Sequence, residues 1–352
     1  MTKLNSPRNR NLAILIAAGV IPAIFRNGSF INFLTDAGAF VLLALGLNIV
    51  IGFAGLLDLG YAAFFAIGSY SFAMLASPQF GIHIPFFVML PVAAIIAALF
   101  GVLLGAPTLR LRGDYLAIVT LGFGEIVPQT FLNLSQFTGG PNGINSLDSP
   151  VFFGYRFGFN TTAFYYLMLA LIVFAVWAAN NLKTSRLGRS WMAIREDELA
   201  AAHMGINTTK AKLAAFALGA SFSGLAGVAY GAKLNLVSPD QFQFNVSVAI
   251  LSMLVLGGMG NIPGVIVGSL VISSLDRFIL PQATNFLQTV VHVNIDLTNS
   301  RFLIYGAILV AMMLFRPEGL IPSRQRAAEL HAADDDEKVL AQEQTLYNRA
   351  TP

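Results

Sequence analysis

Residues 167–179 read Leu-Met-Leu-Ala-Leu-Ile-Val-Phe-Ala-Val-Trp-Ala-Ala, a run without a charged side chain. Strands of a transmembrane β-barrel alternate apolar and polar residues, so a run that is apolar on every face argues against that architecture. A helix that is hydrophobic all round lies in a protein core or in a membrane. Similar apolar blocks recur along the chain, and we therefore expect an all-α polytopic membrane protein.

The composition excludes other classes of protein. Hydrophobic residues make up 56% of the 352 residues and charged residues only 11%, whereas soluble domains have about 45–50% and 25%. Disorder requires the opposite balance. A net charge of +3, with the basic residues between apolar blocks, does not favour nucleic-acid binding. The chain has no cysteine, and its four histidines are far apart, so neither disulfides nor a metal site is predicted.

Ten apolar segments are long enough, or nearly so, to span a bilayer, whose core of about 30 Å requires about 20 helical residues. Gly60 and Gly68 are expected to break the third of them. A count of eight spans is the alternative. The ten segments lie near residues 11–26, 30–53, 56–76, 84–106, 114–134, 161–181, 213–233, 242–258, 262–280 and 301–316.

The positive-inside rule sets the orientation. With the amino terminus inside, 16 of the 21 basic residues fall on the cytoplasmic side, and both termini are cytoplasmic. The amino-terminal basic and apolar stretch is expected to be a retained helix. The resulting organisation is a transmembrane domain over 1–316, with an outer loop at 135–160 and a cytoplasmic loop at 182–212, followed by a polar, solvated cytoplasmic tail over 317–352.

The cytoplasmic loop contains signals for a short helix. Asp197 is a suitable N-cap for a helix through Ala202, and Gly205 is suited to ending it. Such a helix, between two spans, would protrude as a small knob that fits a groove on another protein. Trp177 and Trp191 bracket residues 182–190, as interfacial anchors would.

The loop resembles the coupling helix of ABC importer permeases, whose pattern is Glu-Ala-Ala, three residues, Gly. Here it reads Leu199-Ala-Ala-x-x-x-Gly205, with Glu198 one residue before the expected position. From this segment alone, a helix lying on the membrane surface is an equal alternative. The resemblance implies that these residues contact an ATPase: Glu198, Leu199, Ala200, Ala201, Gly205 and Ile206.

Further blocks extend the resemblance over roughly residues 40–320. In this order they are similar to branched-chain amino acid ABC permeases of the LivM type. The blocks are Gly55-Leu-Leu-Asp-Leu-Gly-Tyr-Ala-Ala-Phe64, Arg110-Leu-Arg-Gly-Asp-Tyr-Leu-Ala-Ile-Val-Thr-Leu-Gly-Phe-Gly-Glu125, Thr138-Gly-Gly-Pro-Asn-Gly143, Gly188 to Gly205, Gly257-Gly-Met-Gly-Asn261 and Arg316-Pro-Glu-Gly-Leu320.

The resemblance implies an ABC importer permease bundle in the bacterial inner membrane. This chain would pair with a second, related permease subunit, and two ATP-binding subunits would dock on the cytoplasmic face. A periplasmic binding protein would deliver branched-chain amino acids. Urea permeases of the same family are very similar, so urea or a short-chain amide is an alternative substrate.

The energy for transport would then come from ATP hydrolysis on other subunits, because this sequence lacks a Gly-x-x-x-x-Gly-Lys-Ser/Thr phosphate loop. ATP and Mg²⁺ are expected on the partner subunits, with no cofactor on this chain and no enzymatic activity of its own. A stand-alone secondary transporter with inverted repeats is the alternative from another class. A membrane enzyme is disfavoured, since the sequence lacks a Ser/His/Asp or metal-ligand constellation.

Two carboxylates fall within predicted spans, where charges are costly and usually functional. Glu125 lies mid-span near Gly122 and Gly124, and Asp58 lies near the start of the broken span. We expect these four residues to line the translocation pathway, because glycine-rich helices pack closely or unwind beside cavities. The alternatives are a structural polar group for Glu125 and an interfacial helix cap for Asp58.

Glycine-rich turns occur on both sides of the membrane. Gly139, Gly140, Pro141, Asn142 and Gly143 predict tight bends in the outer loop. This segment is either an outer gate or docking surface for a binding protein, or a simple connection. The cytoplasmic segment 257–260 predicts a tight turn, with a moving hinge as the alternative.

Overall fold

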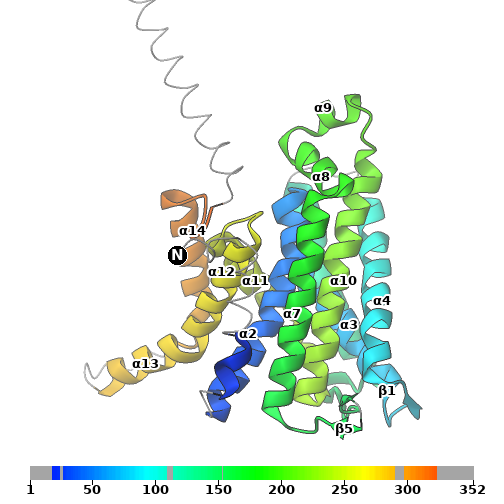
Figure 1. The fold of residues 1–352 in the computed structure, drawn as a ribbon, viewed down its shortest axis with the longest axis vertical. Coiled ribbons are helices and arrows are strands. Elements are labelled where there is room, and N and C mark those ends of the chain that lie inside the picture. The colour runs from blue at the N-terminus through cyan, green and yellow to red at the C-terminus, as the bar shows by residue number, and fades with distance from the viewer. Residues whose placement is uncertain (1–17, 24–26, 109–113, 153, 290–296, 323–352) are drawn as a thin grey trace, which may run out of the picture.

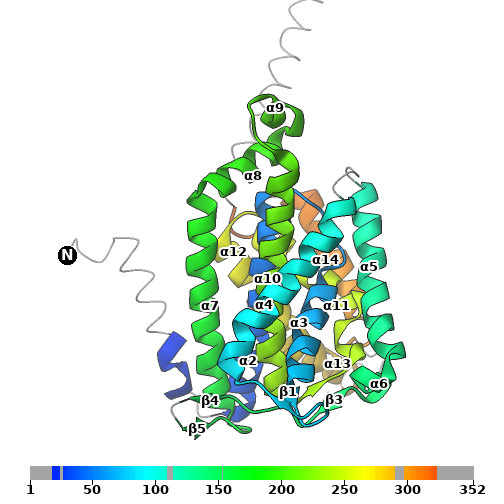
Figure 2. The same ribbon diagram turned by 90° about the vertical axis from the view of Figure 1, so that its right-hand side faces the viewer.

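The computed structural model describes residues 18–23, 27–108, 114–152, 154–289 and 297–322. Long helices run side by side in a bundle (Figures 1 and 2). Helices α8 (Arg186–Glu196) and α9 (Glu198–His203) lie beyond one end of the bundle, and short strands with α6 (Ser135–Thr138) lie at the opposite end. The predicted cytoplasmic and outer loops therefore lie at opposite ends.

Helices dominate the described residues. The long segments are α2 (Gly28–Leu47) with the π-helix η1 (Asn48–Phe53), α4 (Phe86–Thr108), α5 (Asp114–Asn133), α7 (Thr161–Thr184), α10 (Thr208–Leu234), α11 (Phe244–Gly257) and α12 (Ile262–Ser274), which continues through the π-helix η4 (Leu275–Ile279) into α13 (Leu280–Thr289). Two shorter apolar helices are α3 (Tyr61–Leu75) and α14 (Arg301–Phe315).

These helices confirm the prediction of an all-α polytopic membrane protein. Among the described residues, seven helical segments are long and apolar enough to cross a bilayer, and α3 and α14 correspond to two further predicted spans. The remaining predicted span, near 11–26, lies mostly outside the described residues, as does most of the tail. The total of ten spans and the cytoplasmic location of both termini therefore stay predictions.

Helix α10 packs between α2, α3 and α4 through small residues. An added Cβ on Gly68 of α3 would lie 2.5 Å from Cα of Gly224, and one on Gly101 of α4 would lie 2.8 Å from the carbonyl oxygen of Phe216. Lipid provides no hydrophobic force between helices, so such close approach is what holds them together. The prediction that Gly68 breaks its helix is wrong, because α3 continues through it and uses it for packing.

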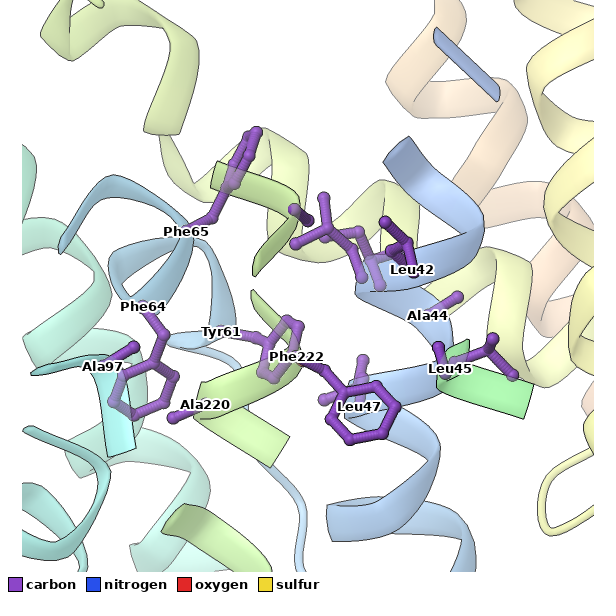
Figure 3. Close-up of a cluster of buried hydrophobic side chains, with 14 of the residues drawn as sticks. Leu42, Ala44, Leu45, Leu47, Tyr61, Phe64, Phe65, Ala97, Ala220 and Phe222 are labelled. Carbon is purple, nitrogen blue, oxygen red and sulfur yellow. The ribbon is translucent and has the colours of Figure 1, made fainter. Parts of the chain in front are cut away.

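Large side chains fill the space around these contacts. Figure 3 shows residues of α2, α3, α4 and α10 in one buried cluster. Tyr61 and Phe222 lie at its centre, with exposed fractions of 4% or less. The Tyr61 hydroxyl donates to the Gly219 carbonyl oxygen at 2.7 Å, so the polar end of this buried ring is satisfied within the bundle.

The predicted break before Gly60 is present. Residues 54–60 form a non-helical link between η1 and α3. An added Cβ on Gly60 would lie 2.0 Å from the carbonyl oxygen of Thr120 in α5. The Leu59 amide donates to the Thr120 hydroxyl at 3.1 Å. Irregular backbone is tolerated in a membrane only against protein or water, and here α5 supplies the protein contact.

Three short antiparallel strand pairs organise the end that holds the outer loop. They are β1 (Ala76–Ser77) with β2 (Ile82–His83), β3 (Ile144–Asn145) with β6 (Leu236–Val237), and β4 (Val151–Phe152) with β5 (Tyr155–Arg156). In the second pair Ile144 faces Val237. This pairing joins the outer loop to the connection between α10 and α11, which also contains the 3-10 helix η3 (Pro239–Phe242).

At the other end, residues after α14 pack back onto the bundle. The amides of Leu320 and Ile321 donate to the carbonyl oxygens of Leu256 and Gly257, at 2.8 and 3.2 Å. The predicted boundary at 316/317 therefore follows the end of α14, but the first residues of the tail belong to the packed structure.

We predict that Gly68→Ala destabilises the chain, because the added methyl group would force the backbones of α3 and α10 apart. Overpacking costs about 1–3 kcal/mol, so the midpoint of thermal unfolding in detergent should fall. Gly306→Ala in α14 is the matched control, since no atom lies within 4 Å of the added Cβ. Equal midpoints for the two variants would contradict the packing role of Gly68.

Candidate functional site

The cytoplasmic loop folds into a knob, formed by α8 and α9, whose helices are capped by side chains. The Ser185 hydroxyl accepts from the Gly188 amide at the start of α8. The Asp197 carboxylate accepts from the amides of Leu199 and Ala200, at 2.8 and 2.9 Å, at the start of α9. The predicted cap at Asp197 is thus confirmed.

Helix α9 ends as predicted at a glycine. Gly205 has φ +84°, the left-handed conformation that glycine adopts without strain. The Ile206 amide donates to the Ala201 carbonyl oxygen at 3.1 Å, the bond of a helix ended by a left-handed residue. Asn207 then caps α10 by accepting from the Lys210 amide. Each reversal of the chain within the knob is therefore fixed by a hydrogen-bonded cap.

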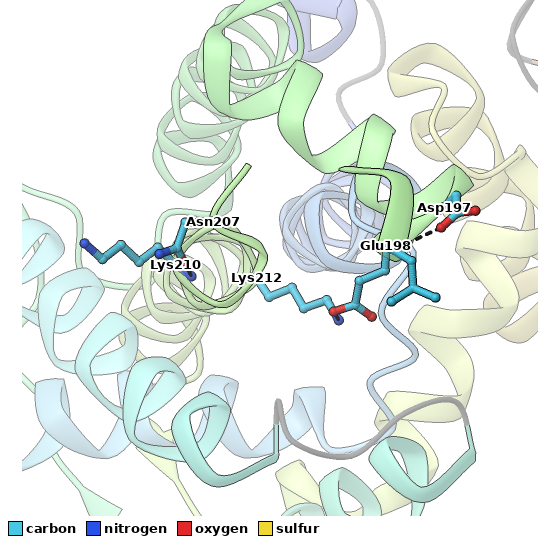
Figure 4. A network of polar contacts seen from close by, with 6 residues as sticks. Asp197, Glu198, Asn207, Lys210 and Lys212 are labelled. Atoms are coloured by element: carbon cyan, nitrogen blue, oxygen red, sulfur yellow. Dashed lines mark hydrogen bonds and ion pairs between the residues drawn. The ribbon is translucent and has the colours of Figure 1, made fainter. Parts of the chain in front are cut away.

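Glu198 pairs with Lys212 of α10, and this contact fixes the knob to the bundle (Figure 4). Its Oε1 lies 2.5 Å from the lysine Nζ. The Lys212 side chain is 7% exposed and that of Glu198 30%. Glu198 therefore turns toward its own chain, rather than outward as a direct contact with another protein. Sequence reasoning missed Lys212, which is separated from Glu198 by a turn and the start of the next span.

The exposed side of α9 has small and apolar residues together with His203. Leu199 is 57% exposed and Met204 84%, and Ala200 is also exposed. Ala201, predicted as a contact residue, is 4% exposed and faces the bundle, and Ile206 is half-buried. Of the predicted coupling residues, Leu199, Ala200 and Gly205 are therefore available to another protein. Met204, which was not predicted, is also available.

Trp191 does not serve as an interfacial anchor, so that prediction is wrong. Its side chain is fully buried, and its Nε1 donates to the Ala211 carbonyl oxygen at 2.6 Å. Trp191 therefore packs α8 against the start of α10. Trp177, by contrast, is 62% exposed on α7. The burial of Trp191 depends on how α8 folds back, which the spacing of the two residues does not reveal.

Two basic side chains, one on α8 of the knob and one at the end of α7, bond to backbone carbonyl oxygens near the ends of helices in the bundle. Nη1 of Arg195 in α8 donates to the Gly52 carbonyl oxygen at 2.7 Å. The Lys183 Nζ donates to the Gly260 carbonyl oxygen at 3.0 Å. The Gly260 amide in turn donates to Oδ1 of Asn48 at 2.8 Å. The end of η1 and the turn between α11 and α12 thus meet beneath the knob.

That turn agrees with the prediction for residues 257–260. Gly258 has φ +112° and Gly260 has φ +79°. An added Cβ on Gly258 would lie 2.7 Å from the Ile321 carbonyl oxygen. The segment is therefore a tight turn covered by the residues that follow α14.

Glu125 lies on the exposed side of α5. Residues at helical spacing form this face, and three of them, Glu125, Gln129 and Asn133, are polar and exposed. Gly122 has no atom within 4 Å of an added Cβ, so it leaves open space beside them. Helix α5 continues through both glycines and Pro128, so no unwinding occurs there.

Asp58 and Gly124 lie elsewhere. Gly124 packs against Gly60, with 2.9 Å between an added Cβ and the Gly60 Cα. Asp58 is 1% exposed, and its Oδ1 accepts from the Gly60 amide at 2.9 Å. Its Oδ2 is buried without a hydrogen-bond partner among the residues that the structure describes. The structure therefore does not bring the two predicted carboxylates together in one site.

The glycine-rich turn of the outer loop is tight. Gly139, Gly140 and Gly143 all have φ between +58° and +72°. An added Cβ on Gly143 would lie 2.1 Å from the Val237 carbonyl oxygen, so this turn packs on β6. Pro141 and Asn142, in the 3-10 helix η2 (Gly140–Asn142), are exposed. The turn thus presents two side chains outward from a fixed backbone.

We predict energetic coupling between Glu198 and Lys212. Glu198→Gln and Lys212→Gln should each lower the unfolding midpoint of the detergent-solubilised chain, and the double variant should lose less than the sum. Contacting residues typically show interaction energies of about 0.5–3 kcal/mol. The exposed His83–Asp148 pair, 2.7 Å apart, is the control, with an expected coupling of about 0–1 kcal/mol. Strict additivity for Glu198 and Lys212 would contradict the assignment.

Comparisons with known proteins give the family. The family model for the branched-chain amino acid transport system permease component matches residues 29–314. The high-affinity branched-chain amino acid transport system permease protein LivM of Escherichia coli (strain K12) is 39% identical over 333 residues, covering 88% of this chain and 74% of that protein. LivM of Salmonella typhimurium has the same identity and coverage.

A more distant relative is LivH of Escherichia coli (strain K12), a permease protein of the same transport system, which is 24% identical over 307 residues, or 82% of this chain and 93% of that protein. No solved structure matches the chain. The family match spans most of the chain and includes the helices that carry the knob, the link at 54–60 and α5. The chain therefore belongs to the family of branched-chain amino acid transport system permease components.

Proposed function

We propose that this chain is one of two permease subunits in an ATP-driven importer of branched-chain amino acids in the bacterial inner membrane. The proposal also includes two ATPase subunits, which carry ATP and Mg²⁺, and a periplasmic binding protein. The relatives named LivM and LivH belong to one such transport system, which supports a pair of related permeases. The observation that carries the proposal is the capped knob, fixed to α10 and exposing Leu199 and Met204.

The exposed face of the knob suits a protein groove. Leu199 and Met204 offer apolar area, and the exposed Ala200 between them keeps the surface low. Covering these side chains with another protein would remove their apolar area from water, which favours association. A helix resting on the membrane surface would need a longer apolar face than the six residues of α9 provide.

Force applied to the knob would reach the membrane through Arg195 of α8 and through Lys183 at the end of α7, to which α8 is joined. These side chains contact the backbone at Gly52 and Gly260, where α2 with η1 ends and where α12 is about to begin. Packed helices respond to such contacts by rigid-body shifts rather than by continuous deformation. We therefore expect ATP binding to tilt α2 and the α11–α12 pair together.

The translocation pathway follows the exposed face of α5. Glu125, Gln129 and Asn133 cannot face lipid without a large cost, so this face meets the second permease subunit across a polar route. The open space at Gly122 adjoins it. Gly124 and Asp58 do not line this face but support α5 from its buried side. Gly124 holds α5 against the link at 54–60, and Asp58 caps that link through the Gly60 amide.

The outer turn at 139–143 would serve as the docking surface for the binding protein. It lies at the end of the bundle opposite the knob (Figure 2). Its backbone is fixed by contact with β6, and Pro141 and Asn142 face outward. A rigid surface of this kind loses little conformational entropy on binding.

Uptake by the native complex in liposomes tests the function. With the binding protein and labelled leucine outside and ATP inside, we expect accumulation that excess valine suppresses and excess urea does not. Accumulation of labelled urea without accumulation of labelled leucine would identify the amide as the substrate. Accumulation driven by an ion gradient without ATP would establish a secondary transporter instead.

We predict that Met204→Asp removes the ATPase subunits from the complex. A charge placed on the apolar face of α9 would have to be buried in the interface without a partner. Isolation of the complex through a tag on this chain, with quantification of the ATPase subunits, should show a loss of about tenfold or more. Thr209→Asp, on an exposed position in the first turn of α10, is the control. Equal recovery from both variants would exclude α9 as the docking element.

We also predict that Glu125→Gln lowers leucine uptake several-fold without changing the composition of the complex. The substitution keeps the shape of the side chain and removes its charge from the proposed route. Ile126→Leu, an exposed neighbour on the same helix, should have no effect. Wild-type uptake by Glu125→Gln would show that this carboxylate does not line the pathway.

A further inference from the structure

A pocket of about 230 Å³ lies between α2, α11, η4 and α14. Its wall is largely apolar, with three aromatic side chains, Phe33, Phe40 and Phe302, and with Val246 and Met253 from α11. The volume is smaller than the roughly 300–1,000 Å³ of pockets for drug-sized ligands, so it suits a small solute.

Charges of both signs line the same pocket. Asp276 of η4 and Arg301 at the start of α14 both contribute, together with Asp240 from η3. Oδ1 of Asp276 lies 3.8 Å from Nη1 of Arg301. This separation is too long for a hydrogen bond. The carboxylate and the guanidinium therefore form an ion pair without a hydrogen bond between these two atoms, and both side chains are partly exposed, so a ligand beside them can still bond to each.

Two further observations indicate that a ligand is expected here. Oδ1 of Asp276 and the Ser273 hydroxyl are buried without hydrogen-bond partners among the residues that the structure describes. Buried polar groups are usually satisfied, and exceptions mark functional places. The Arg301 guanidinium also lies 4.9 Å from the Phe302 ring centroid, a cation–π contact that holds it at the mouth of the pocket.

We propose that this pocket binds the amino acid before it enters the pathway along α5. The inference rests on the proposed function. The Arg301 guanidinium would take the substrate carboxylate, since its planar set of donors matches a carboxylate. Asp276 would accept from the ammonium group, and the branched side chain would lie against the phenylalanines. The zwitterion would lie alongside this ion pair, with its carboxylate next to the guanidinium and its ammonium group next to the carboxylate of Asp276.

The position in the fold fits an early binding step. Asp240 follows β6, which pairs with β3 of the predicted outer loop. The pocket is thus on the outer side of the bundle, away from the knob. A neutral amide such as urea carries no charge to pair with Asp276 or Arg301, and an acyl chain offers these side chains neither a charge nor a hydrogen bond. A zwitterion with an apolar side chain matches both the Asp276–Arg301 pair and the aromatic wall.

Equilibrium binding of labelled L-leucine to the native complex in lipid nanodiscs, without nucleotide or binding protein, tests this pocket. Arg301→Gln and Asp276→Asn should each weaken binding about tenfold or more, because each removes a charge-assisted hydrogen bond. Arg316→Gln, an exposed position just after the opposite end of α14, should bind as the wild type does. Leucine binding that is unchanged in both pocket variants would overturn the proposal.

Competition on the wild-type complex gives a readout that does not depend on the folding of any variant. We expect 4-methylpentanoate, which lacks the ammonium group, and 3-methylbutylamine, which lacks the carboxylate, to compete at least about tenfold more weakly than leucine. Equal competition by all three would contradict recognition of both charges. Absence of leucine transport by the wild-type complex would refute the proposed function, whereas normal transport with unchanged variants would refute the pocket alone.

Discussion

The bilayer cannot hydrogen-bond to backbone or side chains, and the fold depends on how the chain meets this constraint. Helices satisfy the hydrogen bonds of their own backbone. Each non-helical segment within the membrane must therefore be covered by other parts of the protein. The link at 54–60 is covered by α5 through Thr120, and the turn at 257–260 is covered by Asn48 and by the residues after α14. On the same reasoning, the proposed route is placed at the exposed polar side chains of α5, such as Glu125.

The same breaks in helical structure receive the contacts of the cytoplasmic loop. Arg195 and Lys183 reach the carbonyl oxygens of Gly52 and Gly260. The knob is itself rigid, because Asp197, Gly205 and the Glu198–Lys212 pair fix its ends. In the proposed mechanism, a displacement imposed on α9 would be passed through these contacts to η1 and to the turn between α11 and α12. This arrangement links the proposed docking surface to the helices α2, α11 and α12 of the bundle.

Features encoded in nearby residues could be predicted from sequence. The apolar spans, the Asp197 cap, the stop at Gly205 and the glycine turns each depend on a few consecutive residues. Contacts between distant segments could not: the pairing of Glu198 with Lys212, the inward orientation of Ala201, the burial of Trp191 and the packing of Gly68. A glycine in a span can break its helix or allow a second helix to approach closely. Which of these occurs depends on whether another helix packs against the glycine. The pocket between α2, η4 and α14 combines segments more than 200 residues apart.

The central claim is that the knob faces the cytoplasm and is covered there by another protein. The chain has no native cysteine, so Met204→Cys creates a single labelling site at a position 84% exposed in the isolated chain. A membrane-impermeant maleimide should label it in inside-out vesicles only after the ATPase subunits are stripped away, and should leave it unlabelled in right-side-out vesicles. Labelling from the outer side, or equal labelling with and without the ATPase subunits, would contradict the account.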